Sequence, residues 1–252
     1  MTKLIKRLLD LIISLIGVIL SSPLILFVAI AVFLQDRKNP FYFAPRVGKN
    51  GSEFTMFKIR TMVVGADKSG IDSTSGDDLR ITKLGRIIRK YKIDELTQLF
   101  NVLKGEMSLV GPRPNVKRET DLYTIEEGKL LRIKPGITDF ASIVFSDESE
   151  ILSGKEDPDI SYNQLIRPGK SQLGLFYYYN QKITIDFAIL VITLISIASR
   201  ETSLKALVRI LKYYKATQEL ITIAERKGPL VPTPPPGAIN IVTTRSINKD
   251  HS

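Results

Sequence analysis

The longest apolar run lies at the start of the chain. Apolar residues dominate from Leu8 to Leu34, and a Ser-Ser-Pro sequence ending at Pro23 interrupts them near the middle. As one straight helix this run would be about 40 Å long at ~1.5 Å per residue, which exceeds the roughly 30 Å hydrocarbon core of a bilayer. Because proline has no backbone N–H, we expect the helix to be broken or sharply kinked at Ser22-Pro23.

Basic residues flank this run on both sides. They are Lys3, Lys6 and Arg7 before it and Arg37, Lys38, Arg46 and Lys49 after it. Because lysine and arginine favour the cytoplasmic side of a membrane, a broken helix that enters and leaves by the same face fits this charge pattern. Serine hydroxyls at the break would bond the freed carbonyls. A kinked helix that spans the membrane is the alternative.

Alternating apolar residues on either side of an Asn-Gly sequence predict a β-hairpin. The apolar positions are Phe41, Phe43 and Val47 before the turn at 48–51, and Phe54, Met56 and Ile59 after it. The period of two places Lys58 and Arg60 on one face of the second strand, where both would reach a single phosphate group. The alternative is a basic strand edge that prevents pairing with other chains.

Two short helical patterns follow, with Asp94 and Glu95 between them. The first has an apolar face of Leu84, Ile87, Ile88 and Tyr91, and the second has Leu96, Leu99, Phe100 and Leu103. Aspartate is a preferred N-cap, so we place Asp94 at the start of the second helix and Gly105 just past its end.

The start of this second helix is a candidate site for chemistry. A helix N-terminus offers free N–H groups and a partial positive charge, which stabilise a carboxylate anion and bind phosphate. Nearby cationic donors are Arg86, Arg89, Lys92 and Arg113. The prolines on both sides of Arg113 hold it in one direction, as bidentate phosphate recognition requires. Asp94 is then a metal ligand, a nucleophile or both, unless it is an ordinary capping residue on a basic face.

The patterns between this site and the C-terminal part are less regular. The segment 69–78 is polar and glycine-rich and is predicted to be a mobile loop, while 122–132 reads as a short helix and 137–145 as a strand. The many acidic residues of 146–160 fit a solvated loop better than a metal site, because their spacing matches no ligand pattern.

The C-terminal part has mixed membrane features. Residues 183–199 are mostly apolar but contain Asp186, and they are marginal in length for a membrane span. Residues 203–226 form a basic amphipathic pattern that suits a membrane surface. The proline-rich tail, residues 228–252, is predicted to be disordered.

Composition narrows the chemistry. The 252 residues include no cysteine, which excludes a disulfide framework, a cysteine zinc site and a thiol nucleophile. The only histidine, His251, lies in the tail, so catalysis would use carboxylates, lysine, hydroxyls or a bound metal. A net charge of +10 predicts a polyanionic partner, and the separation of apolar from charged segments favours a membrane over nucleic acid.

Four motifs, in order along the chain, resemble one known family. The motifs are KRLLDLIISLIGVILSSPLIL, RVGKNGSEFTMFKIRTM, KIDELTQLFNVLKGEMSLVGPRP and KPGIT. They are similar to the bacterial sugar transferases, the monotopic polyprenol-phosphate phosphoglycosyl transferases that start surface-glycan assembly. The resemblance covers roughly residues 3–142 and continues more weakly to about residue 215. It matches the short form of the family, which has the catalytic domain alone.

The resemblance implies a two-step reaction at the Asp-Glu pair. Asp94 would attack the β-phosphate of a UDP-sugar and release UMP, and the phosphosugar on Asp94 would then pass to polyprenol (undecaprenyl) phosphate. Asp94 would also ligate Mg²⁺, or Mn²⁺ in its place, and Glu95 would handle the acceptor's proton or position the acceptor. The expected phosphate-binding residues are Lys58, Arg60, Arg86, Arg89 and Arg113.

Two segments depart from the family pattern. The usual proline after Asp-Glu-Leu is Thr97 here, and the usual Gly-Trp-Ala-Gln after Pro-Gly-Ile-Thr is the sequence Asp-Phe-Ala-Ser at 139–142. The second segment is expected to touch the sugar or the nucleotide, so the family's sugar assignments are not carried over.

These expectations define a fold and a function. Residues 1–36 are expected to form a re-entrant membrane helix broken at Ser22-Pro23, and residues 37–182 a mostly helical α/β catalytic domain with a small β-hairpin. Residues 183–227 are expected to form interfacial membrane-associated helices, and residues 228–252 are the tail. The expected enzyme is a UDP-sugar:polyprenyl-phosphate sugar-phosphate transferase on the cytoplasmic face of the bacterial inner membrane. It would act in exopolysaccharide or glycoconjugate synthesis beside later glycosyltransferases, with homodimerisation left open and no nucleic-acid partner. A catalytically inactive membrane scaffold is the alternative.

Overall fold

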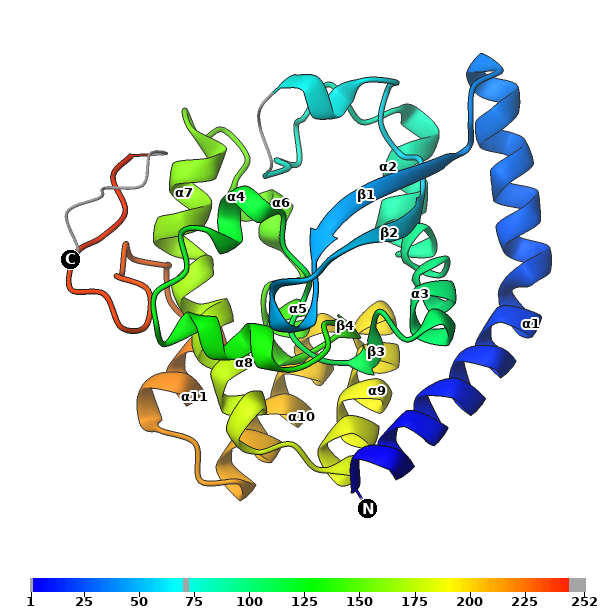
Figure 1. Ribbon diagram of the computed structural model, residues 1–252. Coiled ribbons are helices and arrows are strands. Elements are labelled where there is room, and N and C mark those ends of the chain that lie inside the picture. The colour runs from blue at the N-terminus through cyan, green and yellow to red at the C-terminus, as the bar shows by residue number, and fades with distance from the viewer. Residues whose placement is uncertain (1, 70–72, 245–252) are drawn as a thin grey trace.

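The protein is mostly helical and has two small sheets of two strands each (Figure 1). The structure is a computed structural model, and it describes residues 2–69 and 73–244. The predicted mobile loop at 69–78 falls partly, and His251 wholly, outside the described residues. The expected class, mostly helical with a small β-hairpin, is confirmed.

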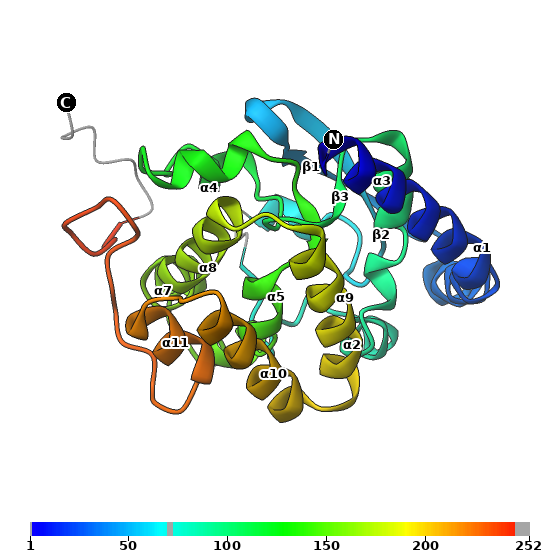
Figure 2. The ribbon, with the colours of Figure 1, turned by 90° about the horizontal axis from the view of Figure 1, so that it is seen from below.

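The N-terminal apolar run forms one long helix, α1 (Thr2–Asp36), with Pro23 inside it. The helix is not interrupted at Pro23, so the predicted break is corrected to a bend between its two halves, which Figures 1 and 2 show from two directions. Pro23 cannot donate to the carbonyl of Ile19, four residues earlier. The Ser22 hydroxyl donates to that carbonyl at 2.9 Å, and Ser21 donates to the Gly17 carbonyl at 2.7 Å. These bonds explain how the helix continues through the proline.

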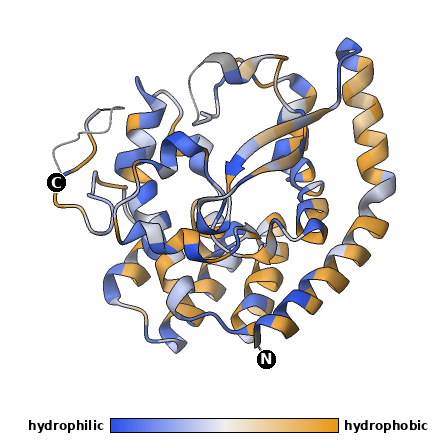
Figure 3. Ribbon diagram, in the orientation of Figure 1, coloured by the Kyte–Doolittle hydropathy of each residue, from blue (hydrophilic) through white to orange (hydrophobic). Residues whose placement is uncertain are grey.

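Both ends of α1 are attached to the same body. Near its start, the Arg7 guanidinium donates to the Val102 and Leu103 carbonyls at 2.7 and 3.1 Å. At its end, the Asp36 carboxylate forms a bidentate ion pair with the Arg60 guanidinium, with N–O distances of 2.6 and 2.7 Å. Between these points the outward face is apolar and exposed, as the hydropathy colouring of Figure 3 shows. Within the described residues, α1 is the one helix whose length and composition would allow it to cross a membrane.

The predicted β-hairpin is confirmed. Strands β1 (Phe41–Val47) and β2 (Glu53–Ile59) pair antiparallel, with Phe41 opposite Ile59 and Val47 opposite Glu53. The connecting η1 turn (Lys49–Gly51) places Asn50 and Gly51 at φ 58° and 78°. Asparagine and glycine tolerate this left-handed region better than other residues, which is why the Asn-Gly sequence marks the turn.

The predicted helix pair is present, but Asp94 is not the N-cap of the second helix. Helix α2 (Lys83–Lys90) is followed by a 3₁₀ turn, η3 (Ile93–Glu95), and then by α3 (Gln98–Lys104). Asp94 lies inside η3, and Thr97 holds the N-cap position of α3. The chain turns before Asp94 because Lys92 is left-handed, with φ 54°. Gly105 ends α3 at φ 88°, as predicted.

The strand predicted over 137–145 is mostly wrong. Only β4 (Gly136–Thr138) is extended, and it pairs parallel to β3 (Ser108–Val110). Helix α5 (Phe140–Val144) begins at Asp139, whose carboxylate accepts from the Ser142 N–H at 2.7 Å while the Ser142 hydroxyl accepts from the Asp139 N–H at 2.8 Å. This reciprocal cap starts a helix where the apolar run alone suggested a strand.

The segments around it are short helices. The 122–132 region holds η4 (Glu127–Arg132) after α4 (Lys117–Thr120), and the acidic region holds α6 (Glu148–Ile151) and the start of α7 (Pro158–Leu165). No cluster of three or more metal-ligating side chains occurs among the described residues.

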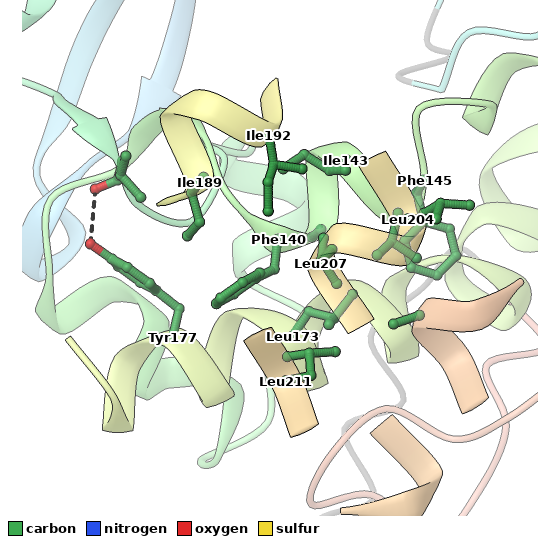
Figure 4. Close-up of a cluster of buried hydrophobic side chains, with 14 of the residues drawn as sticks. Phe140, Ile143, Phe145, Leu173, Tyr177, Ile189, Ile192, Leu204, Leu207 and Leu211 are labelled. Atoms are coloured by element: carbon green, nitrogen blue, oxygen red, sulfur yellow. Dashed lines mark hydrogen bonds between the residues drawn. The ribbon is translucent and has the colours of Figure 1, made fainter. Parts of the chain in front are cut away.

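The core lies between α5 and the C-terminal helices. These are α8 (Arg167–Tyr179), α9 (Ile183–Ala198), α10 (Arg200–Tyr213) and α11 (Gln218–Glu225). Figure 4 shows Phe140, Leu173, Ile189 and Leu207 meeting in this core, and all four are fully buried. The single helix predicted over 203–226 is two helices, because the chain turns between α10 and α11 at Lys215, with φ 54°.

The described part of the proline-rich tail lies against the body. The Thr233 N–H donates to the Gln164 carbonyl at 3.1 Å, and the Gln164 side chain donates to the Val242 carbonyl at 2.8 Å. The Thr124 hydroxyl donates to the Pro236 carbonyl at 2.5 Å. This differs from the predicted disorder, because contacts with α7 and with the segment before η4 hold the tail at Thr233, Pro236 and Val242.

Candidate active site

Asp94 and Glu95 lie at the centre of a small group of charged side chains. Lys58 Nζ, from β2, is 3.4 Å from Asp94 Oδ2 and 3.8 Å from Glu95 Oε1. Arg113 Nη2, from the loop after β3, is 2.5 Å from the same Glu95 oxygen. Two cations and two carboxylates from three separate segments therefore meet here.

Hydrogen bonds between α3 and β2 hold the acidic pair in place. The Asn101 side chain donates to the Thr55 carbonyl at 2.7 Å and accepts from the Phe57 N–H at 2.9 Å. The Thr97 hydroxyl donates to the Phe57 carbonyl at 3.0 Å. Asn101 and Thr97 are both buried. Sequence reasoning missed this role of both residues, because a polar residue on a helix does not reveal which strand it will meet.

The electrostatics keep Glu95 ionised. Burial raises the pKa of Glu95, but the Arg113 and Lys58 charges and the Arg113 hydrogen bond outweigh it and lower the pKa to about 2. In return, the Glu95 charge raises the pKa of Arg113 against the effect of burial. Burial lowers the pKa of Lys58, although the nearby Asp94 charge opposes this. Glu95 is therefore a poor proton acceptor at neutral pH and an effective anchor for Arg113.

A cleft of about 540 Å³ opens beside Asp94. Its walls come from the hairpin, from residues 60–67 and from α2. The basic side chains that line it are Lys38, Arg46, Lys58, Arg60, Arg80 and Arg89. Arg89 Nε donates to the Thr61 hydroxyl at 2.9 Å, and burial lowers the pKa of Arg89. A cleft of this size, with six basic side chains and a buried carboxylate in its wall, suits a phosphorylated small molecule.

The other predicted phosphate-binding residues are placed differently. Arg60 lines the cleft, but its guanidinium is engaged by Asp36 and by the Asn39 carbonyl at 2.7 Å. Arg86 lies on the exposed face of α2 and is not part of the cleft lining. Arg113 borders a second cavity of about 110 Å³ that also contacts Lys58, Arg46 and Lys170. The structure thus brings Lys58, Arg89 and Arg113 near Asp94 or Glu95. Arg60 instead pairs with Asp36 at the end of α1, and Arg86 lies outside the cleft.

The segment that departs from the family pattern lies next to Arg113. Asp139, Ala141 and Ser142 line a small cavity of about 40 Å³ together with Arg113. Burial raises the pKa of Asp139, and the Ser142 hydrogen bonds oppose this. This placement is close to the charged group, so the departure lies at the edge of the candidate site.

The carboxylates present fit a weakly held divalent cation. Mg²⁺ is commonly bound through one or two carboxylates plus substrate phosphates rather than by a protein cage. Asp94 is buried, faces the cleft and has one oxygen 3.4 Å from Lys58. Asp94 is therefore placed to supply one ligand to such a cation.

An apolar groove of about 390 Å³ adjoins the cleft. It follows the second half of α1, and its lining residues are Ser22, Ile25, Leu26, Ala29, Ile30, Phe33, Pro40, Phe41 and Phe100. Phe41 lines both the groove and the cleft. The apolar groove and the cleft beside Asp94 therefore share Phe41 as a wall residue.

Several known proteins with similar sequences are named as sugar transferases or sugar phosphotransferases. The family model described as "Bacterial sugar transferase" matches residues 1–200. The chain is 37% identical to an uncharacterized sugar transferase, EpsL, of Bacillus subtilis, over 75% of this chain and 84% of that protein. It is 37% identical to a UDP-N-acetylgalactosamine-undecaprenyl-phosphate N-acetylgalactosaminephosphotransferase of Aeromonas hydrophila, over 56% of this chain and 34% of that protein.

A third relative has a different sugar in its name. The chain is 36% identical to a UDP-glucose:undecaprenyl-phosphate glucose-1-phosphate transferase of Klebsiella pneumoniae, over 66% of this chain and 36% of that protein. The chain thus spans about a third of the length of these two phosphotransferases and most of the length of EpsL. The family match and the EpsL match each cover most of the chain, and we conclude that the chain belongs to the bacterial sugar transferase family.

Proposed function

We propose that this protein transfers a sugar-1-phosphate from a UDP-sugar to a polyprenol phosphate, with undecaprenyl phosphate as the acceptor and UMP as the product released. The reaction would initiate a surface polysaccharide or glycoconjugate at the cytoplasmic face of the inner membrane. The observation that carries this proposal is the placement of buried Asp94 in the wall of the cleft, 3.4 Å from Lys58 and beside the Glu95–Arg113 pair. The family membership supports the same activity class.

In the first step, an Asp94 carboxylate oxygen attacks the β-phosphorus of the UDP-sugar. A bond forms between that oxygen and phosphorus, and the bond between phosphorus and the bridging oxygen of UMP breaks, so UMP leaves with the electron pair. The sugar phosphate remains on Asp94 as an acyl phosphate. Lys58 and Arg89 supply positive charge along the cleft wall where negative charge gathers on the phosphate oxygens.

In the second step, a phosphate oxygen of the polyprenol phosphate attacks the same phosphorus. The bond from phosphorus to Asp94 breaks, the carboxylate is regenerated, and the product is a polyprenol diphosphate sugar. An acceptor that enters as the dianion needs no proton transfer. Glu95, whose pKa is lowered to about 2 by Arg113 and Lys58 against the effect of burial, then positions Arg113 rather than removing a proton.

A divalent cation would complete the charge balance. Mg²⁺, or Mn²⁺ in its place, bound by Asp94 and the substrate phosphates would offset the repulsion between the anionic donor and the anionic acceptor.

The acceptor's lipid chain would lie in the apolar groove along α1. The groove meets the cleft at Phe41, so a lipid in the groove would present its phosphate to Asp94. Because both ends of α1 contact the same body, through Arg7 and Asp36, the helix would enter the membrane and return on one face rather than span it. The bend at Pro23 supports this re-entrant arrangement.

The test is UMP release by the purified full-length protein with a panel of UDP-sugars and polyprenol phosphate, with Mg²⁺ and with EDTA. We expect Mg²⁺-dependent UMP from one donor, and a sugar-phosphate mass added to the peptide that holds Asp94 when the acceptor is omitted. Asp94→Asn should lower turnover by at least about 10³-fold. Asp121→Asn, at an exposed ion pair with Lys117, is the matched control and should keep full activity. Normal turnover by Asp94→Asn would refute the mechanism, and folded protein without UMP from any donor would favour the inactive scaffold.

A further inference from the structure

A second cavity, of about 110 Å³, adjoins the cleft beside Asp94. Lys58, Arg46 and Val116 line both spaces, so the cavity and the cleft meet at these residues. Asp94 lines the cleft alone, whereas Arg113 lines the second cavity alone. The charged group of the candidate active site therefore lies where two spaces of different size come together.

Three helices supply a polar wall of the second cavity. Glu148 comes from α6, Tyr162 from α7 and Lys170 from α8. Glu148 and Lys170 form an ion pair, and the Lys170 ammonium lies 5.2 Å from the centre of the Tyr162 ring. Burial raises the pKa of Tyr162, so its hydroxyl stays protonated. These contacts fix a carboxylate, an ammonium and a phenol in one wall.

The charges around the second cavity are balanced. The charged side chains that line it are the cations Arg46, Lys58, Arg113 and Lys170 and the carboxylates Glu119 and Glu148. Two more carboxylates are close by, because Asp94 pairs with Lys58 at 3.4 Å and Glu95 with Arg113 at 2.5 Å. Burying an ionised ligand group in a balanced site is costly, whereas neutral hydroxyl groups can donate to the carboxylates and accept from the cations. The second cavity therefore suits an uncharged polar ligand.

The size and the remaining wall of the second cavity suit a single sugar ring. A volume of about 110 Å³ has room for several water molecules, and so for several hydroxyl groups on one ring. Met56, Pro114 and Val116 add apolar surface, which the C–H groups of a sugar ring can contact. The cleft is larger, at about 540 Å³, and six basic side chains line it, so it suits the more anionic nucleotide half of a donor.

We propose that the second cavity is the sugar subsite, that it takes an uncharged, hydroxyl-bearing sugar ring, and that Glu148, Lys170 and Tyr162 select the sugar. The nucleotide half of the donor then lies in the cleft, and the β-phosphate lies at Lys58, beside Asp94. The inference rests on the proposed function, because it assumes a UDP-sugar donor, and it adds the direction in which that donor lies and the class of its sugar.

The test is calorimetric binding to full-length Asp94→Asn protein in detergent with Mg²⁺, because this background does not consume the donor. The ligands are UDP, UDP-glucose, UDP-N-acetylglucosamine, UDP-N-acetylgalactosamine and UDP-glucuronate. We expect at least one neutral UDP-sugar to bind about tenfold more tightly than UDP, as hydrogen bonds to charged groups would provide. UDP-glucuronate, whose ring carries a carboxylate, should bind no more tightly than UDP.

Glu148→Gln, added to this background, tests the polar wall. It removes one charge and keeps the size of the side chain. We expect it to weaken the preferred UDP-sugar about tenfold and to leave the affinity for UDP unchanged. Tyr162→Phe removes only the phenol oxygen and should weaken the same UDP-sugar about threefold. Glu150→Gln is the matched control, because Glu150 is an exposed residue of the same helix and lines neither space.

Turnover in the wild-type background gives a second measurement. Glu148→Gln should raise the KM for the UDP-sugar about tenfold and leave the KM for polyprenol phosphate unchanged. Equal losses of UDP and UDP-sugar affinity in Glu148→Gln, or no loss of either, would place the sugar elsewhere and overturn the subsite.

Two further results separate the subsite from the proposed function. If UDP binds but no neutral UDP-sugar binds more tightly than UDP, the subsite is wrong and the UDP-sugar donor stands. If the folded protein binds neither UDP nor any UDP-sugar, the donor class in the proposed function is wrong, and the sugar subsite is refuted with it.

Discussion

Arg113 donates a 2.5 Å hydrogen bond to Glu95, the residue directly after the proposed nucleophile Asp94. The bond connects the proline-flanked loop after β3 with the 3₁₀ turn that carries the acidic pair. It gives the two neighbouring carboxylates different roles, because Glu95 is neutralised by an arginine while Asp94 faces the cleft near a lysine. The proposed nucleophile and its neighbour Glu95 are thus adjacent in sequence and differ in their partners.

The Glu95–Arg113 pair should make the free energy of unfolding decrease as the pH falls into the acid range. The pKa of Glu95 is about 2 in the folded protein, lowered by Arg113 and Lys58 against burial, and its ordinary value is 4.5. A carboxyl group with a lowered pKa stabilises the fold fully above its unfolded pKa, and this contribution is lost as the pH falls toward the folded pKa. We expect the free energy of unfolding of the wild type to exceed that of Glu95→Gln by roughly 3 kcal/mol at pH 7. This difference should shrink as the pH falls from 4.5 toward 2.

Urea unfolding of both proteins in detergent, at steps from pH 7 to pH 3, measures this difference. A constant difference across the range would mean that Glu95 acts by packing alone and not by its charge.

Asn101 should be the main support of the acidic pair from α3. Asn101→Ala leaves the Thr55 carbonyl and the Phe57 N–H without their buried partners, so we expect a loss of about 2–4 kcal/mol of unfolding free energy. Turnover should fall as well, because η3 and β2 lose their fixed spacing. Gln172→Ala removes a single exposed hydrogen bond to Glu219 and should change stability by less than about 0.5 kcal/mol. If both variants unfold alike, the side-chain bridge is not what holds the pair.

The topology of α1 can be read with cysteine reporters, because the chain has no cysteine of its own. A re-entrant α1 places Lys3→Cys and Lys155→Cys on the same side of the membrane. A membrane-impermeant thiol reagent should therefore label both in inside-out vesicles and neither in right-side-out vesicles. Labelling of the two positions from opposite sides would show that α1 spans the bilayer.

A bulky side chain in the apolar groove should obstruct the acceptor and not the donor. Ile30 lines the groove and is 50% exposed, so Ile30→Trp narrows it without filling the core. We expect the KM for polyprenol phosphate to rise about tenfold, a loss of ~1.4 kcal/mol, with the KM for the UDP-sugar unchanged. Leu20→Trp places the same side chain on α1 at a position outside the groove lining and is the control. A matched rise in both KM values would locate the effect in the cleft rather than in the groove.

Much of the candidate site was predictable from local sequence. The Asn-Gly turn and alternating apolar residues predict the hairpin that carries Lys58, since turn geometry and pleat are local properties. The apolar faces of α2 and α3 bracket the Asp-Glu pair for the same reason. Prolines on both sides of Arg113 predict a stiff loop, and that loop does deliver Arg113 to Glu95.

Only the tertiary structure decided which long-range partners these elements would take. Asp94 does not occupy the predicted N-cap position. Lys92 adopts a left-handed conformation before it, and the side chains of Thr97 and Asn101 donate hydrogen bonds to backbone carbonyls of β2. Arg60 was predicted to bind phosphate, but its guanidinium forms an ion pair with Asp36, which is 24 residues earlier in the chain. Local patterns determine where a helix or strand forms, but the pairing of a buried charge depends on packing between distant segments, which no short-range periodicity encodes.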